Sequence, residues 1–149
     1  MTVRTRRTAV AVVAMLVAAA WTGLAACQGS GGGDGAWYRV EAPAVTLAAG
    51  ASGTASVRFQ PRAGYHWNGE FPARLKVSDP GTATLAKADF TNSGGDFQDQ
   101  GGTGVLAIPL TAGTASQSVL KGVADFSVCN DKECRIFKQV AIEVPLHVQ

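Results

Sequence analysis

Apolar residues alternate with polar ones along most of this chain, and this alternation restricts the possible fold more than any other feature. Between Thr54 and Gln60 the apolar side chains occupy every second position, and the run from Ala73 to Ser78 repeats the pattern. Such alternation places one face of an extended strand in a core and the other face in solvent. Beyond residue 26, no segment shows the period of about 3.6 residues of an amphipathic helix. The sequence therefore predicts strands rather than helices.

Further strand candidates recur at short intervals, separated by glycine and proline turns such as 61–64 and 79–81. The candidates are residues 37–41, 45–48, 82–86, 104–111, 116–129 and 134–148. Regularly spaced strands over about 100 residues are typical of a two-sheet domain. We therefore predict an all-β, immunoglobulin-like antiparallel β-sandwich that spans residues 37–149. Pro109 cannot donate a ladder hydrogen bond, which predicts that part of 104–111 lies near a sheet edge.

The segment 91–103, TNSGGDFQDQGGT, is polar and rich in glycine. Its composition predicts a long surface loop, with a loosely held hairpin as the alternative. Phe97 is the single large apolar residue in this segment, and a solvent-exposed loop does not explain why a large apolar side chain is present there.

The first 26 residues have the pattern of an export signal. Arg4, Arg6 and Arg7 precede an apolar run, AVAVVAMLVAAAWTGLAAC, that ends at small residues. The tetrapeptide LAAC at 24–27 resembles a bacterial lipobox. That resemblance implies a signal peptide over residues 1–26, cleavage before Cys27 and a lipid on Cys27. A plain secretory signal with an incidental cysteine is the alternative.

The segment 27–36 would then be an acylated cysteine followed by a flexible Gly/Ser-rich linker. This organisation predicts a lipoprotein of the bacterial cell envelope that faces the periplasm. Gln28 stands where an aspartate is associated with retention in the inner membrane, so the outer membrane is favoured over the inner one.

Removal of the signal changes the charge of the chain. Three of the 13 basic residues leave with the signal while all 11 acidic residues stay, so no basic field remains to attract nucleic acid. Both methionines also lie in the signal, which excludes a methionine-based copper site. No second apolar run approaches the about 20 residues that span a bilayer. We predict no cofactor.

The stretch FSVCNDKECRIF contains two cysteines that would face each other across a hairpin with the loop 130–133. Directly opposed residues of antiparallel strands have Cα atoms about 4.5–5.5 Å apart, which suits a disulfide. The same register opposes Asp125 to Lys138, Phe126 to Phe137 and Val123 to Val140. The apolar residues of the first strand have the opposite parity to its cysteine, whereas those of the second strand share the parity of theirs. We therefore expect a β-bulge near the pair.

Three chemistries are open to Cys129 and Cys134. A disulfide that closes so short a loop removes little chain entropy, and a hairpin tip is accessible to another thiol, which favours redox exchange over a structural bond. Nearby Lys132 and Arg135 favour a thiolate, whereas Asp131 and Glu133 oppose it. Zinc bound by the two cysteines with His66 and His147 is a third, weaker possibility.

The chain from about 37 to 149 resembles the N-terminal periplasmic domain of the thiol:disulfide interchange reductase DsbD, the disulfide bond corrector domain. The segments that match are VRF at 57–59, AGYHW at 63–67, DF at 96–97, LAIPL at 106–110, CND with the second cysteine at 129–134, and VPL at 144–146. The spacing of the cysteines is one residue shorter than in that family, and Arg135-Ile136 replaces a Pro-Pro.

The resemblance implies an immunoglobulin-like sandwich in which Cys129 and Cys134 are the redox pair. It further implies that Phe97 caps the pair until a partner docks, and that Tyr65 and His66 lie near the cysteines. The partner would be a thiol- or disulfide-bearing envelope protein, and the pair would need a separate reductant or would act as a carrier or an oxidant. The competing hypothesis is a non-enzymatic binding or structural lipoprotein of the envelope whose hairpin disulfide is inert.

Overall fold

The structure is a computed structural model, and it describes residues 35–149. The predicted signal peptide 1–26, the predicted lipidation residue Cys27 and most of the predicted linker 27–36 lie outside the described residues. Every regular element from residue 35 onward is a β-strand. That part of the chain accordingly has no helix long and apolar enough to cross a membrane.

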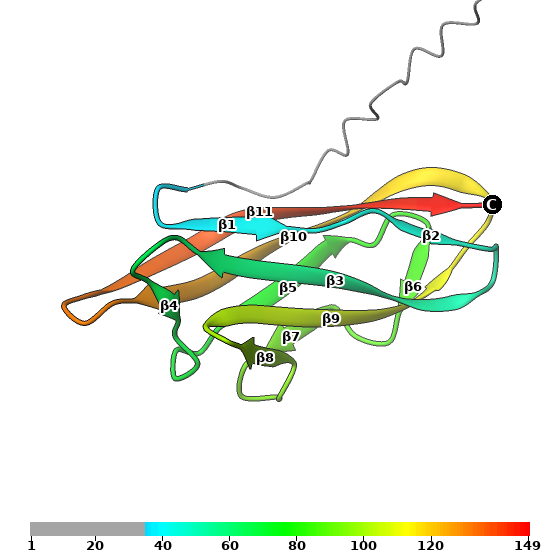
Figure 1. The fold of residues 1–149 in the computed structure, drawn as a ribbon. Helices are drawn as coiled ribbons and strands as arrows, with labels where there is room; N and C mark the ends of the chain where they lie inside the picture. The colour runs from blue at the N-terminus through cyan, green and yellow to red at the C-terminus, as the bar shows by residue number, and fades with distance from the viewer. Residues whose placement is uncertain (1–34) are drawn as a thin grey trace, which may run out of the picture.

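The described strands form two sheets that pack face to face (Figure 1). The first sheet has the order β1-β3-β9-β6, and β8 also pairs with β9. Its strands are β1 (Tyr38–Glu41), β3 (Ser52–Pro61), β6 (Ala83–Leu85), β8 (Phe97–Gln100) and β9 (Thr103–Ala112). The second sheet has the order β2-β11-β10-β5-β7, and β4 also pairs with β10. Its strands are β2 (Val45–Leu47), β4 (His66–Trp67), β5 (Arg74–Asp79), β7 (Asp89–Thr91), β10 (Ser116–Cys129) and β11 (Cys134–Val148).

The predicted immunoglobulin-like sandwich is therefore confirmed, with one difference. The pair β2–β11 is parallel, whereas the other pairs are antiparallel. Pro43 lies between β1 of one sheet and β2 of the other. Proline has no backbone N–H to donate to a ladder, so the chain leaves the first sheet there and joins the second.

One core fills the space between the sheets, and the period-two alternation accounts for it. Ala55, Val57 and Phe59 of β3 are fully buried, and in β5 Leu75 and Val77 are buried. The polar residues between them face outward. The predicted strand faces are thus confirmed in both segments.

The hairpin β10–β11 begins its pairing at Cys129 and Cys134, with the loop 130–133 between them, as predicted. Phe126 opposes Phe137, which is the predicted register near the tip. Further along, the predicted pairing of Val123 with Val140 is wrong, because a bulge shifts the register and Val123 opposes Ala141.

The bulge consists of Lys138 and Gln139, which together oppose Asp125. Gln139 has a φ of 55°, and its backbone N–H donates to Asp125 Oδ1 at 2.7 Å. A bulge reverses the parity of a strand, so Phe137 on one side and Ile142 on the other both pack toward the core. The predicted bulge therefore exists, a few residues further from the cysteines than expected.

The predicted long surface loop 91–103 is wrong, and the alternative of a hairpin is present, because residues 97–103 belong to the β8–β9 hairpin. β8 pairs with β9 from Phe97–Leu106 to Gln100–Thr103, and Gly101 and Gly102 form the turn. Both glycines have positive φ, 63° and 83°, which a two-residue hairpin turn of type I′ requires. The burial of Phe97 attaches this short strand to the core.

Pro109 lies where β9 has a strand neighbour on one side alone. β3 pairs with β9 along most of its length, but on the other side β8 pairs with β9 only as far as Leu106 and β6 only from Leu110 onward. This gap agrees with the prediction that the proline-containing part of the strand lies near an edge.

Candidate functional site

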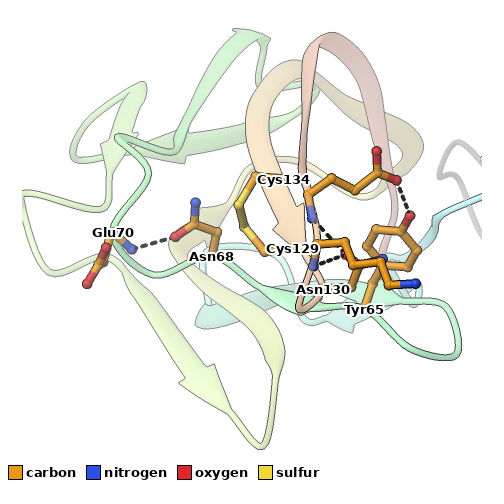
Figure 2. Close-up of a disulfide and its surroundings, with 8 residues drawn as sticks. Tyr65, Asn68, Glu70, Cys129, Asn130 and Cys134 are labelled. Carbon is orange, nitrogen blue, oxygen red and sulfur yellow. Dashed lines mark hydrogen bonds between the residues drawn. A yellow bond between two sulfur atoms is a disulfide. The ribbon is translucent and has the colours of Figure 1, made fainter.

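The predicted cysteine pair forms a disulfide at the tip of the β10–β11 hairpin (Figure 2). The S–S distance is 2.05 Å, and the Cα atoms of Cys129 and Cys134 are 4.0 Å apart. This Cα distance is close to that of a non-hydrogen-bonded cross-strand pair, about 4.5 Å. The next pair toward the loop is hydrogen-bonded, since Asn130 N donates to Glu133 O at 2.9 Å. The ladder therefore continues past the disulfide into the turn.

The side chain of Asn130 holds the turn in place. Its Oδ1 accepts hydrogen bonds from the backbone N–H groups of Lys132 at 2.9 Å and Glu133 at 2.8 Å. An asparagine side chain that accepts from the backbone two residues later is an Asx-turn. The two cysteines are thus held together by local hydrogen bonds in addition to the covalent bond.

Four side chains form a brace, residues Trp37, Tyr65, Glu133 and Arg135, that joins the hairpin tip to the rest of the domain. Tyr65 Oη donates to Glu133 Oε1 at 2.7 Å, and Arg135 Nε donates to the same oxygen at 2.9 Å. The Arg135 guanidinium lies over the Trp37 ring, 4.4 Å from its centroid. The hydrogen bond from Tyr65, together with the bond and charge of Arg135, lowers the pKa of the Glu133 carboxyl below its usual range.

The two cysteines point to the outer face of the second sheet. Val128 and Trp67, which form the preceding cross-strand pair, are buried in the core, so the alternation directs Cys129 and His66 outward. Pairing across β4, β10 and β11 places His66, Cys129 and Cys134 side by side in one row. Cys129 is 7% exposed, whereas Cys134 is an exposed residue. An incoming thiol would therefore meet Cys134 first.

A second row of outer-face residues lies beside the disulfide. Asn68 N donates to Ser127 O at 3.1 Å, and Ser127 pairs with Ile136 of β11. Figure 2 shows the Asn68 side chain next to the sulfur atoms, and its Oδ1 accepts from Glu70 N at 3.1 Å. Ile136 is 57% exposed, an unusual exposure for a large apolar side chain.

Ser127 is a site residue that the sequence reasoning missed. It is 1% exposed, and its Oγ has no hydrogen-bond partner among the described residues. The signal for its position was available, because Ser127 has the same parity as Cys129 in a strand whose other parity is apolar. Its burial was not evident, because local alternation does not show which distant segments, such as the one at Asn68, lie beside this part of β10.

Phe97 does not lie over the disulfide. It is 6% exposed, and its ring stacks on Trp67 with centroids 5.6 Å apart and also contacts Phe59. Trp67 lies on the core side of the second sheet, whereas the Cys129 side chain points to the outer face. In this state the residue expected to be a cap is part of the aromatic core beneath the site.

The expected neighbours Tyr65 and His66 are at the site, but His147 is not. Tyr65 reaches Glu133, and His66 opposes Cys129. His147 pairs with Gln117 near the far end of the hairpin, so it cannot share a metal ion with the cysteines. Within residues 35–149 no group of three or more His, Cys, Asp or Glu side chains is placed to hold a metal ion.

Comparison with known proteins gives similarity of structure alone. Neither the protein-family models nor the curated proteins contain a match to this chain. Among solved structures, domains 4 and 5 of the S-layer protein SbsC are 12% identical with a TM-score of 0.36; the match covers 74% of this chain and half of that one. AggA, the major subunit of aggregative adherence fimbriae type I from Escherichia coli, is 9% identical with a TM-score of 0.37, over 75% of this chain and 94% of AggA. The CooA pilin subunit from enterotoxigenic Escherichia coli is 10% identical with a TM-score of 0.29, over 71% and 90%.

Proposed function

We propose that this protein is a lipid-anchored thiol–disulfide exchange module of the bacterial envelope that passes reducing equivalents to or from a cysteine-bearing partner. The observation that supports this most directly is the position of the disulfide. It lies at the tip of the last hairpin, with Cys134 exposed and Cys129 buried behind it. Exchange needs a disulfide sulfur that an attacking thiolate can reach.

The proposed reaction begins with a dithiol protein as the reductant. One thiolate of that partner attacks Sγ of Cys134, the partner–Cys134 disulfide forms, and the Cys129–Cys134 bond breaks with its electron pair on Cys129 Sγ. The second thiol of the partner then attacks the partner's first sulfur in the mixed disulfide, and Cys134 is released as a thiol. Two electrons and two protons have then moved to this chain, and the partner carries the disulfide. The reverse sequence would reduce the disulfide of another protein.

The burial difference assigns the roles of the two sulfurs within this proposal. Nucleophilic attack requires approach along the S–S axis to the accessible sulfur, which favours Cys134 as the attacked atom. Cys129 is then the leaving and resolving sulfur.

The resemblance to the disulfide bond corrector domain and the predicted export signal support the proposed location in the envelope, with the lipid on Cys27 as the anchor.

The first test is the reduction potential of the pair, measured by equilibration of the full chain with dithiol redox buffers. Structural disulfides have potentials below about −300 mV, and exchange-active ones lie above this value. A value above it is the expected result. A value well below it would instead support the competing function, an envelope binding or structural protein with an inert disulfide.

The second test uses single-cysteine variants in the cell. The variant Cys129→Ser keeps the accessible Cys134, cannot resolve a mixed disulfide and should accumulate as a covalent adduct with an envelope protein that a thiol reagent releases. The matched variant Cys134→Ser keeps the buried cysteine and should form far less adduct. Equal and negligible adduct from both variants would contradict the proposed exchange.

A further inference from the structure

We propose that His66 and Ser127 form the site that receives the Cys129 thiolate when the disulfide opens. This inference rests on the proposed function and names the residues that would stabilise its reduced state. Attack on Cys134 leaves the electron pair of the broken bond on Cys129 Sγ. Cys129 is 7% exposed, and burial without hydrogen-bond donors disfavours a charged sulfur. The released thiolate therefore needs donors on the outer face of the sheet.

His66 is the first donor. The β4–β10 pairing places it directly opposite Cys129, and both side chains point away from the core. Directly opposed residues in such a pair have Cβ atoms about 4.5–5.5 Å apart, which is within reach of an imidazole. An imidazole has at least one N–H in either protonation state, so His66 can donate to the sulfur at any pH near neutrality.

Ser127 is the second donor, and its present state is otherwise hard to explain. It is 1% exposed, and its Oγ lacks a hydrogen-bond partner among residues 35–149. Buried polar groups are nearly always paired, so an exception calls for a reason. Ser127 lies two residues before Cys129 on the same face, so the two Cα atoms are about 6.6 Å apart along the strand. A disulfide sulfur is a weak acceptor, whereas a thiolate is a charged and strong one. Opening of the disulfide would therefore provide the missing partner.

The remaining charged groups at this end of the domain have hydrogen-bond partners of their own or are exposed. Glu133 and Arg135 bond to each other and to Tyr65. Asp99 accepts a hydrogen bond from Gly102 N at 2.8 Å, in the turn that borders His66. The exposed charges nearby are Glu70 before β5 and Asp131 and Lys132 in the hairpin loop. Substitution of His66 or Ser127 leaves all of these groups unchanged, so its effect on the sulfur can be separated from theirs.

The experiment measures the alkylation of both cysteines in the reduced full chain as a function of pH, with iodoacetamide as the probe. Trypsin separates the two thiols, because cleavage after Lys121, Lys132 and Arg135 gives the peptide 122–132 with Cys129 and the peptide 133–135 with Cys134. Mass spectrometry of the peptides then gives one rate for each sulfur in the same sample. The Cys134 rate is an internal control for folding and reagent.

The variants His66→Leu and Ser127→Ala, which each remove a donor, should each slow alkylation of Cys129 at pH 7 by about threefold to tenfold, the effect of losing one hydrogen bond to the sulfur. The pH at half-maximal rate should rise in both. The control His147→Leu, at the far end of β11, should change neither quantity. A residue that only packs against Cys129 would alter the maximal rate and leave the half-maximal pH in place.

An unchanged half-maximal pH in both variants would overturn the inference. This outcome is distinct from failure of the proposed function, because adduct formation by Cys129→Ser could still occur with an unaltered thiolate. Conversely, the Cys129 thiolate could depend on His66 and Ser127 in a protein that forms no adduct. That result would support the donor site and contradict the exchange function.

Discussion

Gly104 is the residue whose size is most tightly fixed by the aromatic core. A Cβ built there would lie 2.3 Å from the Trp67 ring, which is itself packed against Phe59, Phe97 and Phe126. We predict that Gly104→Ala lowers the free energy of unfolding by about 1–3 kcal/mol, because the ring must shift in a filled core. Urea denaturation measures this. The control Gly69→Ala, where a Cβ meets nothing within 4 Å, should have little effect. Equal stability of the two variants would show that Trp67 is free to move.

Phe97 provides a second test at the same scale. Its ring lies in the core rather than over the sulfurs, so Phe97→Ala should cost about 3–5 kcal/mol of stability, the usual range for a buried aromatic. A residue that acted only as a cap would instead speed the labelling of the cysteines and leave stability unchanged. Thermal unfolding and the alkylation rate of the native, mildly reduced protein distinguish the two. A loss below about 1 kcal/mol would contradict the core assignment.

Glu133 connects the hairpin tip to pH. The largest cause of its lowered pKa is the hydrogen bond from Tyr65, followed by the hydrogen bond and the charge of Arg135. A carboxyl with a lowered folded pKa contributes stability above its ordinary pKa and loses it as the pH falls through the lowered value. We therefore expect the brace to hold at neutral pH and to open in acid. The Glu133 titration followed by NMR should move to higher pH in Tyr65→Phe, and an unmoved midpoint would mean that Tyr65 makes no such bond in solution.

Among the elements, the bulge in β11 sets which face of the hairpin tip is apolar. Gln139 adopts a φ of 55°, which glycine accepts without the steric cost that other residues meet. Gln139→Gly should therefore stabilise the domain by up to about 1 kcal/mol, whereas the β-branched Gln139→Val should destabilise it by about 1–2 kcal/mol. Chemical denaturation of both variants checks the prediction. The opposite order would mean that the strand is regular at this point.

The same element shows how far the sequence could predict the fold. The pairings of Cys129 with Cys134 and of Phe126 with Phe137 follow from a short loop and a continuous local pattern, and both are present. The position of the bulge was not predictable, because it depends on which residues the opposite sheet must cover. The hairpin that contains β8 was only the alternative prediction, because glycines and polar residues dominate its sequence, although one buried side chain, Phe97, is enough to attach it to the core.

The site shows the same limit. Alternation placed Cys129 on the outer face, and the resemblance placed Tyr65 and His66 near it, but neither could show that the outer face is covered at Ser127. The chain that bonds to Ser127, at Asn68, is distant in sequence and reaches β10 only through the folded domain. Local pattern therefore predicted the pair, and tertiary packing determined its surroundings.

At the scale of the whole molecule, the question is whether the sandwich needs its disulfide. The bond links residues only five positions apart, whereas one continuous core joins the two sheets. The chain-entropy model gives about 2 kcal/mol for so short a loop, against nearly 5 kcal/mol for a loop of about 100 residues. We predict that the double variant Cys129→Ala/Cys134→Ala loses about 2 kcal/mol in urea denaturation and keeps the near-ultraviolet circular dichroism of its aromatic core.

This result bears directly on the proposed exchange, because a module that is reduced and reoxidised must stay folded in both states. Residues 130–133 are held by the Asn130 side chain, and Tyr65 and Arg135 bind Glu133, so the tip retains contacts that do not involve sulfur. The reduced wild-type protein should therefore have the stability of the double variant within about 1 kcal/mol. Cooperative unfolding on reduction would instead make the bond a staple, since a domain that collapses without its disulfide cannot return the pair to a partner in the same geometry.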